Sequence, residues 1–455
     1  MSLHYKKGRQ DGIYNRKMSN IIRYITAIIL TAVTLTAPAQ EEAHIDTARY
    51  QYVDGQENEL SNCSTLIDDG DITDTVCVSV LTCSPGEELY SRFGHTAIRV
   101  HLAKQYIDIV LNYGCFNYNS DNFVIKFLLG QTDYLLEGEA YNSFIRRYEK
   151  MGQSVTEQVL NTTPQEEEAL IQLLRENLQP ENQQYRYVWL YDNCTERARD
   201  VIEQAINGKV EYQRAGDSHT VRQLLRSCLT ASAPWAMFGI DMILGEEIDA
   251  APDRRVQMFL PHFFSDELRS AVIKRNGEKA VKMVKRENVV LESTTAEPEP
   301  LSVFLRPSCV FLFLLIAFVL IMAYEVSRAR YLWGIDVTLH MLQGIAGILV
   351  SFLFFFSKHP GVDTNWLVIM FNPLWIAYAI WIARCQRKKV CNRLGIANMV
   401  LTTLFLVFMC ISRQSFSTGM YFLVAALMLR ACVQGHFMYH TQKDHRASQR
   451  RAKNM

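Results

Sequence analysis

The sequence lacks net charge, and acidic residues are scarce in its last third. Across 455 residues, 47 Lys and Arg balance 47 Asp and Glu. After residue 300, 16 basic residues stand against 4 acidic ones, whereas residues 1–300 hold 31 against 43. The acidic first part therefore has no basic excess with which to bind nucleic acid. The 49% hydrophobic content also excludes a disordered protein, and the length excludes a disulfide-stabilised miniprotein.

The N-terminus has the three parts of a secretory signal. Residues 1–23 are basic, residues 24–35 are apolar, and Ala37-Pro38-Ala39 has the small residues of a cleavage site. No lipobox cysteine follows, and the apolar run is short for an uncleaved anchor, which is the alternative. We predict a signal peptide over residues 1–39 and a flexible, polar leader over residues 40–75.

Five apolar stretches after residue 300 are long enough to cross a bilayer. They span about 307–324, 331–357, 364–383, 394–412 and 417–438. If the preceding part is exported, the cytoplasmic connections hold 12 Lys and Arg, whereas the outward loops hold only Lys358 and Arg413. This asymmetry follows the positive-inside rule. We therefore predict an exported domain over 76–285, a linker over 286–302, a transmembrane domain over 303–440 and a basic cytoplasmic tail over 441–455.

Within the exported domain, short Val, Ile, Leu and Tyr runs predict strands over 78–82, 96–101 and 106–113. A capping residue, a proline and a glutamate predict a helix that begins at Thr163. Residues 234–245 are apolar but short for a span. We interpret them as buried core rather than as a surface that dips into the lipid headgroups.

The segment 185–206 carries the strongest chemical signal. A strand ends there and a helix begins, with Asn193 as a natural N-cap and Glu196 three residues on. Cys194 then lies in the first helical turn, where the positive end of the helix dipole favours a thiolate. The competing interpretation makes Cys194 half of a disulfide, since six of the 11 cysteines lie in the part that would be exported.

A cysteine nucleophile needs a histidine base and a group that orients the imidazole. His95 follows a glycine near the start of a predicted strand, although a lone strand histidine is more often a packed residue. A hairpin loop over 102–105 would pair His101 with Tyr106 and set Asn112 opposite His95. A carboxylate would stabilise imidazolium better, which favours Asp108. Both orienting residues remain candidates.

Polar residues also occur in the spans and in one outward loop. Asp336, His340 and Gln343 are spaced to share a face of the second span, and hydrogen bonding between helices is the favoured interpretation over a functional site. Arg430 is interpreted as a paired or snorkelling residue near the inner surface. His359, Pro360 and Asn365 lie in the outward loop and are candidates for lining a lipid entrance.

A histidine on an early strand with a much later Asn-Cys pair at a strand-to-helix junction is similar to the circularly permuted papain-like enzymes. Their lecithin-retinol acyltransferase branch has an Asn-Cys-Glu-His motif, from which Thr195-Glu196 departs. More closely, the chain resembles the bacterial Lnb lipoprotein N-acyltransferases, once known only as a domain of unknown function. The matching segments are 81–86, 91–100, 112–114, 191–197 with Asp200, 357–360 and 372–373.

This resemblance covers nearly the whole mature chain. It implies an α+β, permuted papain-like exported domain followed by an all-α five-helix transmembrane domain, in the bacterial inner membrane with the first domain in the periplasm. It further implies a thiol acyltransferase that moves an acyl chain from a phospholipid, through a thioester on Cys194, to the amine of a lipoprotein's diacylglyceryl-cysteine. His95 would be the acid and base, without metal or cofactor. The candidates for substrate or oxyanion contacts are Asn193, Arg92, Arg197, His359 and Asn365.

Two other functions compete with this one. A membrane-anchored papain-like cysteine peptidase or amidase could act on cell-wall peptides, but one or two spans would suffice to anchor it. A non-enzymatic scaffold or sensor would not depend on the Cys194 thiol.

Overall fold

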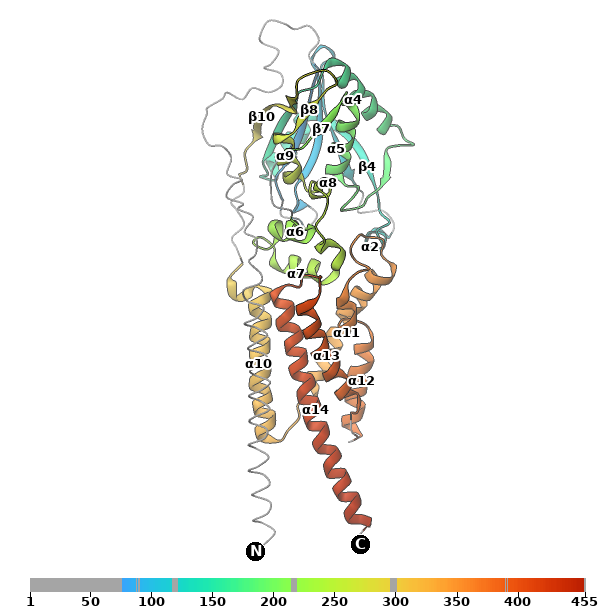
Figure 1. Cartoon of the computed structure of the whole chain (residues 1–455), viewed down its shortest axis with the longest axis vertical. Coiled ribbons are helices and arrows are strands. Elements are labelled where there is room, and N and C mark those ends of the chain that lie inside the picture. The colour runs from blue at the N-terminus through green and yellow to red at the C-terminus, as the bar shows by residue number, and fades with distance from the viewer. Residues whose placement is uncertain are drawn as a thin grey trace.

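The computed structural model describes residues 76–86, 88, 91–116, 122–213, 219–294, 301–388, 390 and 392–453. The exported domain lies at one end of the molecule, and a bundle of long helices forms the other end (Figure 1). The signal peptide and leader predicted over residues 1–75 lie outside the described residues.

An antiparallel sheet forms the centre of the exported domain, and the described residues contribute seven strands to it in the order β10-β5-β1-β2-β3-β4-β6. Its strands are β1 (Val76–Cys83), β2 (His95–Leu102), β3 (Ile107–Cys115), β4 (Asp133–Ala140), β5 (Val155–Leu160), β6 (Gln184–Arg186) and β10 (Val284–Leu291). A smaller sheet joins β7 (Lys209–Glu211), β8 (Val272–Lys274) and β9 (Val281–Lys282). The three strands predicted from β-branched and aromatic runs are confirmed as β1, β2 and β3.

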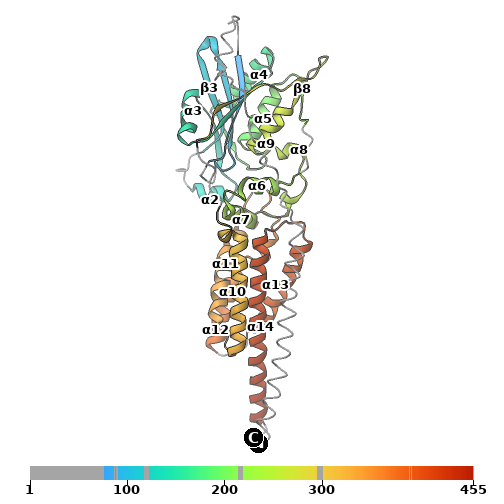
Figure 2. The same cartoon turned by 90° about the vertical axis from the view of Figure 1, so that its left-hand side faces the viewer.

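Helices cover both faces of the large sheet (Figure 2). The helices α4 (Pro164–Asn177), α5 (Cys194–Ala205) and α9 (Pro261–Ser270) pack on one face, and α3 (Tyr141–Lys150) packs on the other. Helix α4 begins with the predicted capping box. The hydroxyl of Thr163 accepts the Glu166 N–H, and the Glu166 carboxylate accepts the Thr163 N–H. The central strands β1, β2 and β5 are thus buried on both faces.

Two sequence predictions are wrong in detail. Strand β10 pairs with β5 at the edge of the large sheet, so the exported domain continues to Leu291, beyond the predicted boundary at residue 285. The β2–β3 hairpin pairs His101 with Asp108 instead of Tyr106, because the loop includes Tyr106 in a left-handed conformation with φ of 54°. The observed β2–β3 register therefore differs from the predicted register by two residues. A shift of two keeps every side chain on its predicted face.

Within the described residues, five helices are long and apolar enough to cross a membrane, as predicted. They are α10 (Pro307–Arg328), α11 (Trp333–Phe356), η7 with α12 (Trp366–Arg387), α13 (Leu394–Ile411) and the apolar part of α14 (Thr418–Phe437). Helix α14 continues to Lys453 through the segment predicted as a basic tail. Short helices lie between the sheet and this bundle: α2 (Phe123–Leu128), α6 (Val221–Leu229), α7 (Pro234–Ile243) and α8 (Arg254–Gln257).

The polar groups inside the bundle bond to one another. Arg430 on α14 donates to Glu325 on α10 and to Asp336 on α11, and all three side chains are fully buried. His340 bonds to Gln343, whose amide donates to the Met370 carbonyl. These contacts connect different helices, as the favoured interpretation predicted, and they satisfy charges that would otherwise be costly in a bilayer.

Helices α6 and α7 attach the exported domain to the bundle. Met237 and Phe238 of α7 are buried, and Phe238 and Trp235 contact the ring of Phe311 on α10. The Trp235 indole N–H donates to the Leu305 carbonyl. The apolar segment 234–245 therefore contributes buried contacts between the two domains, as the favoured interpretation predicted for Met237 and Phe238, whereas Trp235 on the same helix is 43% exposed.

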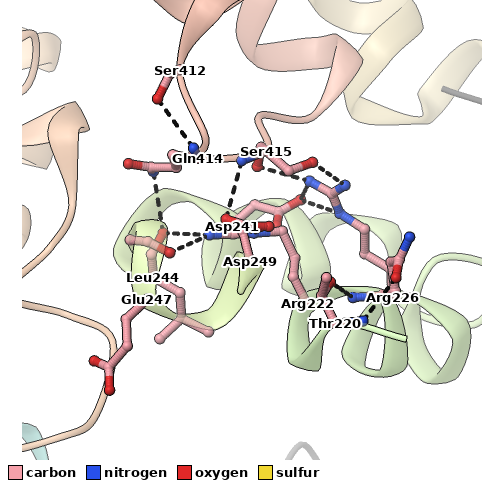
Figure 3. A network of polar contacts seen from close by, with 12 residues as sticks. Thr220, Arg222, Arg226, Asp241, Leu244, Glu247, Asp249, Ser412, Gln414 and Ser415 are labelled. Atoms are coloured by element: carbon pink, nitrogen blue, oxygen red, sulfur yellow. Dashed lines mark hydrogen bonds and ion pairs between the residues drawn. The ribbon is translucent and has the colours of Figure 1, made fainter. Parts of the chain in front are cut away.

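A buried polar network completes this junction (Figure 3). The guanidinium of Arg222 donates to Asp241 and Asp249, each at 2.8 Å, and its side chain is fully buried. Arg226 donates to the Ser415 hydroxyl at 3.0 Å, and the Ser415 N–H donates to Asp249 at 3.0 Å. Ser415 lies in the outward α13–α14 loop. The exported domain is thus tied to the outward side of the spans, which is the side that the charge asymmetry predicted.

Candidate active site

Cys194 is a free thiol at the first position of α5. The Asn193 side-chain oxygen accepts the N–H groups of Thr195 at 2.8 Å and Glu196 at 3.1 Å, which confirms the predicted N-cap. The Asn193 amide donates to the carbonyls of Trp189 and Phe259, both at 2.9 Å. Both amide hydrogens are therefore used, and Asn193 is a capping residue instead of the oxyanion donor that the sequence suggested.

Gly94 places the candidate base at the start of β2. Its φ is +78°, and a Cβ there would lie 2.5 Å from the carbonyl oxygen of Cys83, so both the conformation and the space require glycine. The next residue, His95, pairs with Cys83 across the β1–β2 ladder. The half-buried His95 imidazole forms a side-chain hydrogen bond with Cys194. His95 and Cys194, which are 99 residues apart in the sequence, therefore lie close together at one end of the sheet.

Asn112 on β3 contacts the His95 imidazole. Its side-chain oxygen lies 3.1 Å from His95 Nε2, while its amide nitrogen donates to Glu139 at 3.0 Å. The Glu139 carboxylate can only accept a hydrogen bond, so the Asn112 amide nitrogen must face Glu139 and the Asn112 oxygen must face His95. Nε2 of His95 therefore carries the proton. The other ring nitrogen of His95, Nδ1, is then available to form a hydrogen bond with the Cys194 thiol. The order Cys, His, Asn is the arrangement of papain-like enzymes.

Asp108, the other candidate for this role, is engaged elsewhere. Its carboxylate accepts two hydrogen bonds from the guanidinium of Arg99, at 2.9 and 2.8 Å. Arg99 in turn is buried and also donates to Glu157. Asp108 therefore belongs to an ion-pair network four residues along β3 from Asn112.

Two residues without a sequence signal extend the hydrogen-bond chain behind Asn112. Glu139 on β4 accepts both from Asn112 and from Arg147 on α3. Arg147 lies over the ring of Tyr148, with its guanidinium carbon 5.0 Å from the ring centroid. The chain therefore continues from the imidazole through an amide and a carboxylate to a guanidinium, and each link fixes the orientation of the one before it.

The surroundings of the thiol favour an ion pair. Burial alone would raise the pKa of Cys194, but the charge and hydrogen bond of His95, the Thr96 N–H and the Thr195 hydroxyl together lower it. For His95, burial would lower the pKa, but the charge and hydrogen bond of Cys194 and the bond to Asn112 raise it. The two shifts have opposite sign and a common cause, which is a thiolate next to an imidazolium.

Other cysteines of the exported domain are chemically different. Burial raises the pKa of Cys83, Cys115 and Cys228 to about 12 in each case. Cys228 also lies near a histidine, with its sulfur 3.9 Å from Nε2 of His262. It is in the last turn of α6, however, where the helix dipole disfavours a thiolate. Proximity to histidine alone does not activate a thiol, and Cys228 is a natural control for Cys194.

Gly114 and Tyr185 also lie beside the Cys194 thiol. Gly114, with φ of +90°, lies at an irregularity in the β3–β4 ladder, and a Cβ there would be 3.4 Å from Cys194 Cβ and 3.9 Å from the Tyr185 hydroxyl. Among the described residues, that buried hydroxyl has no hydrogen-bond partner. Arg197, a predicted substrate contact, lies 4.1 Å over the Tyr185 ring and pairs with Asp192. Arg197 thus supports Tyr185.

The other residues that were predicted to contact the substrate or the oxyanion are spread over the structure. Half-buried Arg92 lies in the turn before β2, three residues from His95. Asn365 is buried at the domain junction, where it donates to Met242 and accepts from Leu367 and Gln414. It therefore does not line a lipid entrance. No group of three or more His, Cys, Asp or Glu in the described part of the chain is arranged to hold a metal ion.

His359 contacts the exported domain. Its Nε2 donates to the Phe127 carbonyl of α2 at 2.7 Å, and the Lys358 N–H donates to the Leu129 carbonyl at 3.0 Å. The outward end of span α11 is therefore hydrogen-bonded to α2, which follows the strand that carries Asn112 and Gly114.

Comparison with known families agrees with this two-part organisation. The family model described as the Lnb N-terminal periplasmic domain matches residues 70–227, and the model described as the Lnb transmembrane domain matches residues 299–442. No curated protein and no solved structure matches the chain. The two models together match more than half of its length. The chain therefore belongs to the Lnb family, as a multi-pass membrane protein with a periplasmic N-terminal domain.

Proposed function

We propose that this protein is a lipoprotein N-acyltransferase of the bacterial inner membrane, and that Cys194 carries the acyl chain. The observation that supports this most strongly is the hydrogen-bonded series Cys194, His95 and Asn112, held above the outward side of five spans. A thiolate beside an imidazolium is suited to attack an acyl carbonyl and to release an alcohol.

In the first half-reaction, the Cys194 thiolate attacks an ester carbonyl carbon of a membrane phospholipid. The carbon–sulfur bond forms, the carbon–oxygen bond to the glycerol breaks, and the His95 imidazolium gives its proton to the departing oxygen. The products are a thioester on Cys194, a neutral imidazole and a lysophospholipid.

In the second half-reaction, the free amine of a lipoprotein's N-terminal diacylglyceryl-cysteine attacks the thioester carbon. The carbon–nitrogen bond forms and the carbon–sulfur bond breaks. His95 accepts the proton from the amine, which restores the thiolate and imidazolium. Asn112 holds the imidazole in the orientation that both proton transfers need.

The oxyanion of each tetrahedral intermediate needs donors beside the thiol. The N–H groups of Thr195 and Glu196 are occupied by the Asn193 cap, which does not use the Cys194 N–H. We assign the oxyanion to the Cys194 N–H at the helix terminus and to the buried Tyr185 hydroxyl. Cys194 Cβ and the Tyr185 hydroxyl both lie within 4 Å of the position that a Cβ on Gly114 would occupy.

The test is mass spectrometry of lipoprotein N-terminal peptides from cells that carry wild-type protein, Cys194→Ala or the control Cys228→Ala. We expect the third acyl chain to be present with wild type and Cys228→Ala and to be absent with Cys194→Ala. Release of cell-wall peptides by the wild type, with unchanged lipoprotein acylation, would support the peptidase or amidase instead. Full acylation with Cys194→Ala would support a scaffold.

A further inference from the structure

A short helix between the sheet and the spans exposes an apolar surface. Helix α2 has six residues, and Val124, Ile125 and Phe127 on it are 67%, 54% and 43% exposed. The sheet domain does not bury these side chains, and a soluble surface rarely gathers three of them on six residues. The same helix carries Lys126, a cation of the kind that binds lipid phosphate.

The hydrogen bonds to span α11 fix the position of α2 relative to the bilayer. His359 and Lys358 bind the carbonyls of Phe127 and Leu129, immediately beyond the last turn of α11. That turn ends with Phe355 and Phe356, which are 68% and 63% exposed and face the lipid if α11 spans the membrane. Both views place α2 at the outward end of α11 (Figures 1 and 2). The exposed apolar side chains of α2 therefore lie on a helix that is hydrogen-bonded to the outward end of a span.

Aromatic rings connect α2 to the active site. Phe127 contacts Phe123 at 6.2 Å between centroids, Phe123 stacks on Phe116 at 5.6 Å, and Phe116 contacts Tyr134 at 5.1 Å. Tyr134 contacts Tyr187 at 4.1 Å. We call Phe127, Phe123, Phe116, Tyr134 and Tyr187 the aromatic series.

The inner end of the aromatic series adjoins Cys194. Tyr187 and Phe116 pack against the same core cluster as Cys194. Tyr134 also pairs with Tyr185 across β4 and β6, and Tyr185 is the residue that lies beside the thiol. Burial and then the charge of Cys194 raise the pKa of Tyr187, as expected for a phenol close to a thiolate. The five rings therefore form a contacting series that begins at α2 and ends against the core cluster on which Cys194 also packs.

We propose that the aromatic series is the binding site for the acyl chain that is transferred, and that α2 enters the outer part of the bilayer to admit that chain. This assignment rests on the proposed acyl transfer. Once the thioester has formed, its chain must begin at the Cys194 sulfur and continue over apolar surface, and the aromatic series supplies such a surface toward the lipid. The same contacts keep water from the thioester.

The test compares two acyl donors on the full-length protein. Long-chain transfer is measured as the rate of acyl-Cys194 formation in vesicles of phosphatidylethanolamine and phosphatidylglycerol. Short-chain transfer is measured with p-nitrophenyl butyrate in water, because its chain is too short to reach α2. Ile125→Glu places a charge on the exposed face of α2, and Phe116→Ala removes the central ring. The control Tyr106→Glu changes a residue that is 97% exposed in the β2–β3 loop, at the other end of β2 from His95.

We expect both variants to lower the ratio of the long-chain rate to the short-chain rate at least tenfold relative to wild type. Loss of contact with two or three methylenes is enough for a tenfold effect. Tyr106→Glu should change neither rate. An unchanged ratio of long-chain to short-chain rates in Ile125→Glu and Phe116→Ala would overturn the acyl-chain site. A wild type that forms no acyl-Cys194 with either donor would overturn the proposed function itself.

A second measurement does not depend on the folding of these variants. Cys194→Ala protein in the same vesicles is crosslinked with phosphatidylethanolamine that carries a photoreactive group at the end of one acyl chain. We expect labelled peptides from α2 and from Phe116 in addition to those from the spans. Labelling confined to the spans would contradict the proposal.

Discussion

Replacement of His95 by alanine should raise the pKa of the Cys194 thiol. With the imidazole present, its charge and hydrogen bond offset the effect of burial and lower the pKa of the thiol. Without it, burial is the dominant remaining influence, and the pKa should rise above the value of about 8.5 for a free thiol. At pH 7 a free cysteine is only a few per cent thiolate. With the wild-type thiol largely ionised, as the proposed ion pair requires, the rate of alkylation at pH 7 should therefore fall about 30-fold or more.

Iodoacetamide labelling across a range of pH measures this effect. Among the described free cysteines of the exported domain, the label should report Cys194 selectively near neutral pH, because burial raises the pKa of Cys83, Cys115 and Cys228 to about 12. We expect a midpoint below that of a free thiol in the wild type and above it in His95→Ala. His101→Ala is the matched control, since it changes a buried histidine at the other end of the same strand. Equal midpoints for wild type and His95→Ala would refute the ion pair.

Three other substitutions probe separate parts of the structure. Asn112→Leu should lower the acyl-transfer rate about 10- to 100-fold, because it leaves the His95 Nε2–H without its acceptor, and circular dichroism should show an intact fold. Tyr185→Phe should lower the rate constant of acylation about 100-fold without weakening vesicle binding, and an unchanged rate would remove Tyr185 from the oxyanion site. Arg222→Met should destabilise the domain junction by about 3–5 kcal/mol, because it leaves the buried Asp249 carboxylate without its ion pair and removes one of the two guanidinium partners of Asp241. In thermal unfolding, Arg254→Met, which breaks a partly exposed ion pair, should have a much smaller effect.

The local part of the candidate site could be predicted from the sequence. An asparagine before a polar first turn predicts a helix N-cap, and the cap places Cys194 at the first helical position. A glycine before a strand similarly predicts where His95 lies. Each inference uses residues that are adjacent in the chain, so local propensity is sufficient.

The choice between Asn112 and Asp108 required the strand register, which the sequence does not determine. Tyr106 adopts a left-handed conformation and lengthens the hairpin loop, and nothing in its residue type predicts this. Because the displacement is two residues, Asn112 stays on the same face as His95. Asp108 moves opposite His101 and pairs with Arg99.

The long-range contacts have no sequence signal. Glu139 and Arg147 look like ordinary surface charges, and their role depends on β4 lying next to β3 and on α3 packing across the sheet. Arg222 likewise gives no indication that it is buried against two aspartates. The pattern around Asn365 suggested a free polar loop, but its side chain is buried and hydrogen-bonded at the junction. Such roles emerge only when the tertiary structure is known.

The most direct test of the account follows a single acyl chain through the protein. Full-length wild-type protein is mixed with phosphatidylethanolamine, its intact mass is measured, and a diacylated lipopeptide with a free N-terminal amine is then added. We predict a mass increase of one acyl chain on Cys194 that hydroxylamine removes, followed by its loss at the rate at which the amide appears on the lipopeptide. Absence of that adduct, or its loss as free fatty acid with no amide formed, would contradict the account.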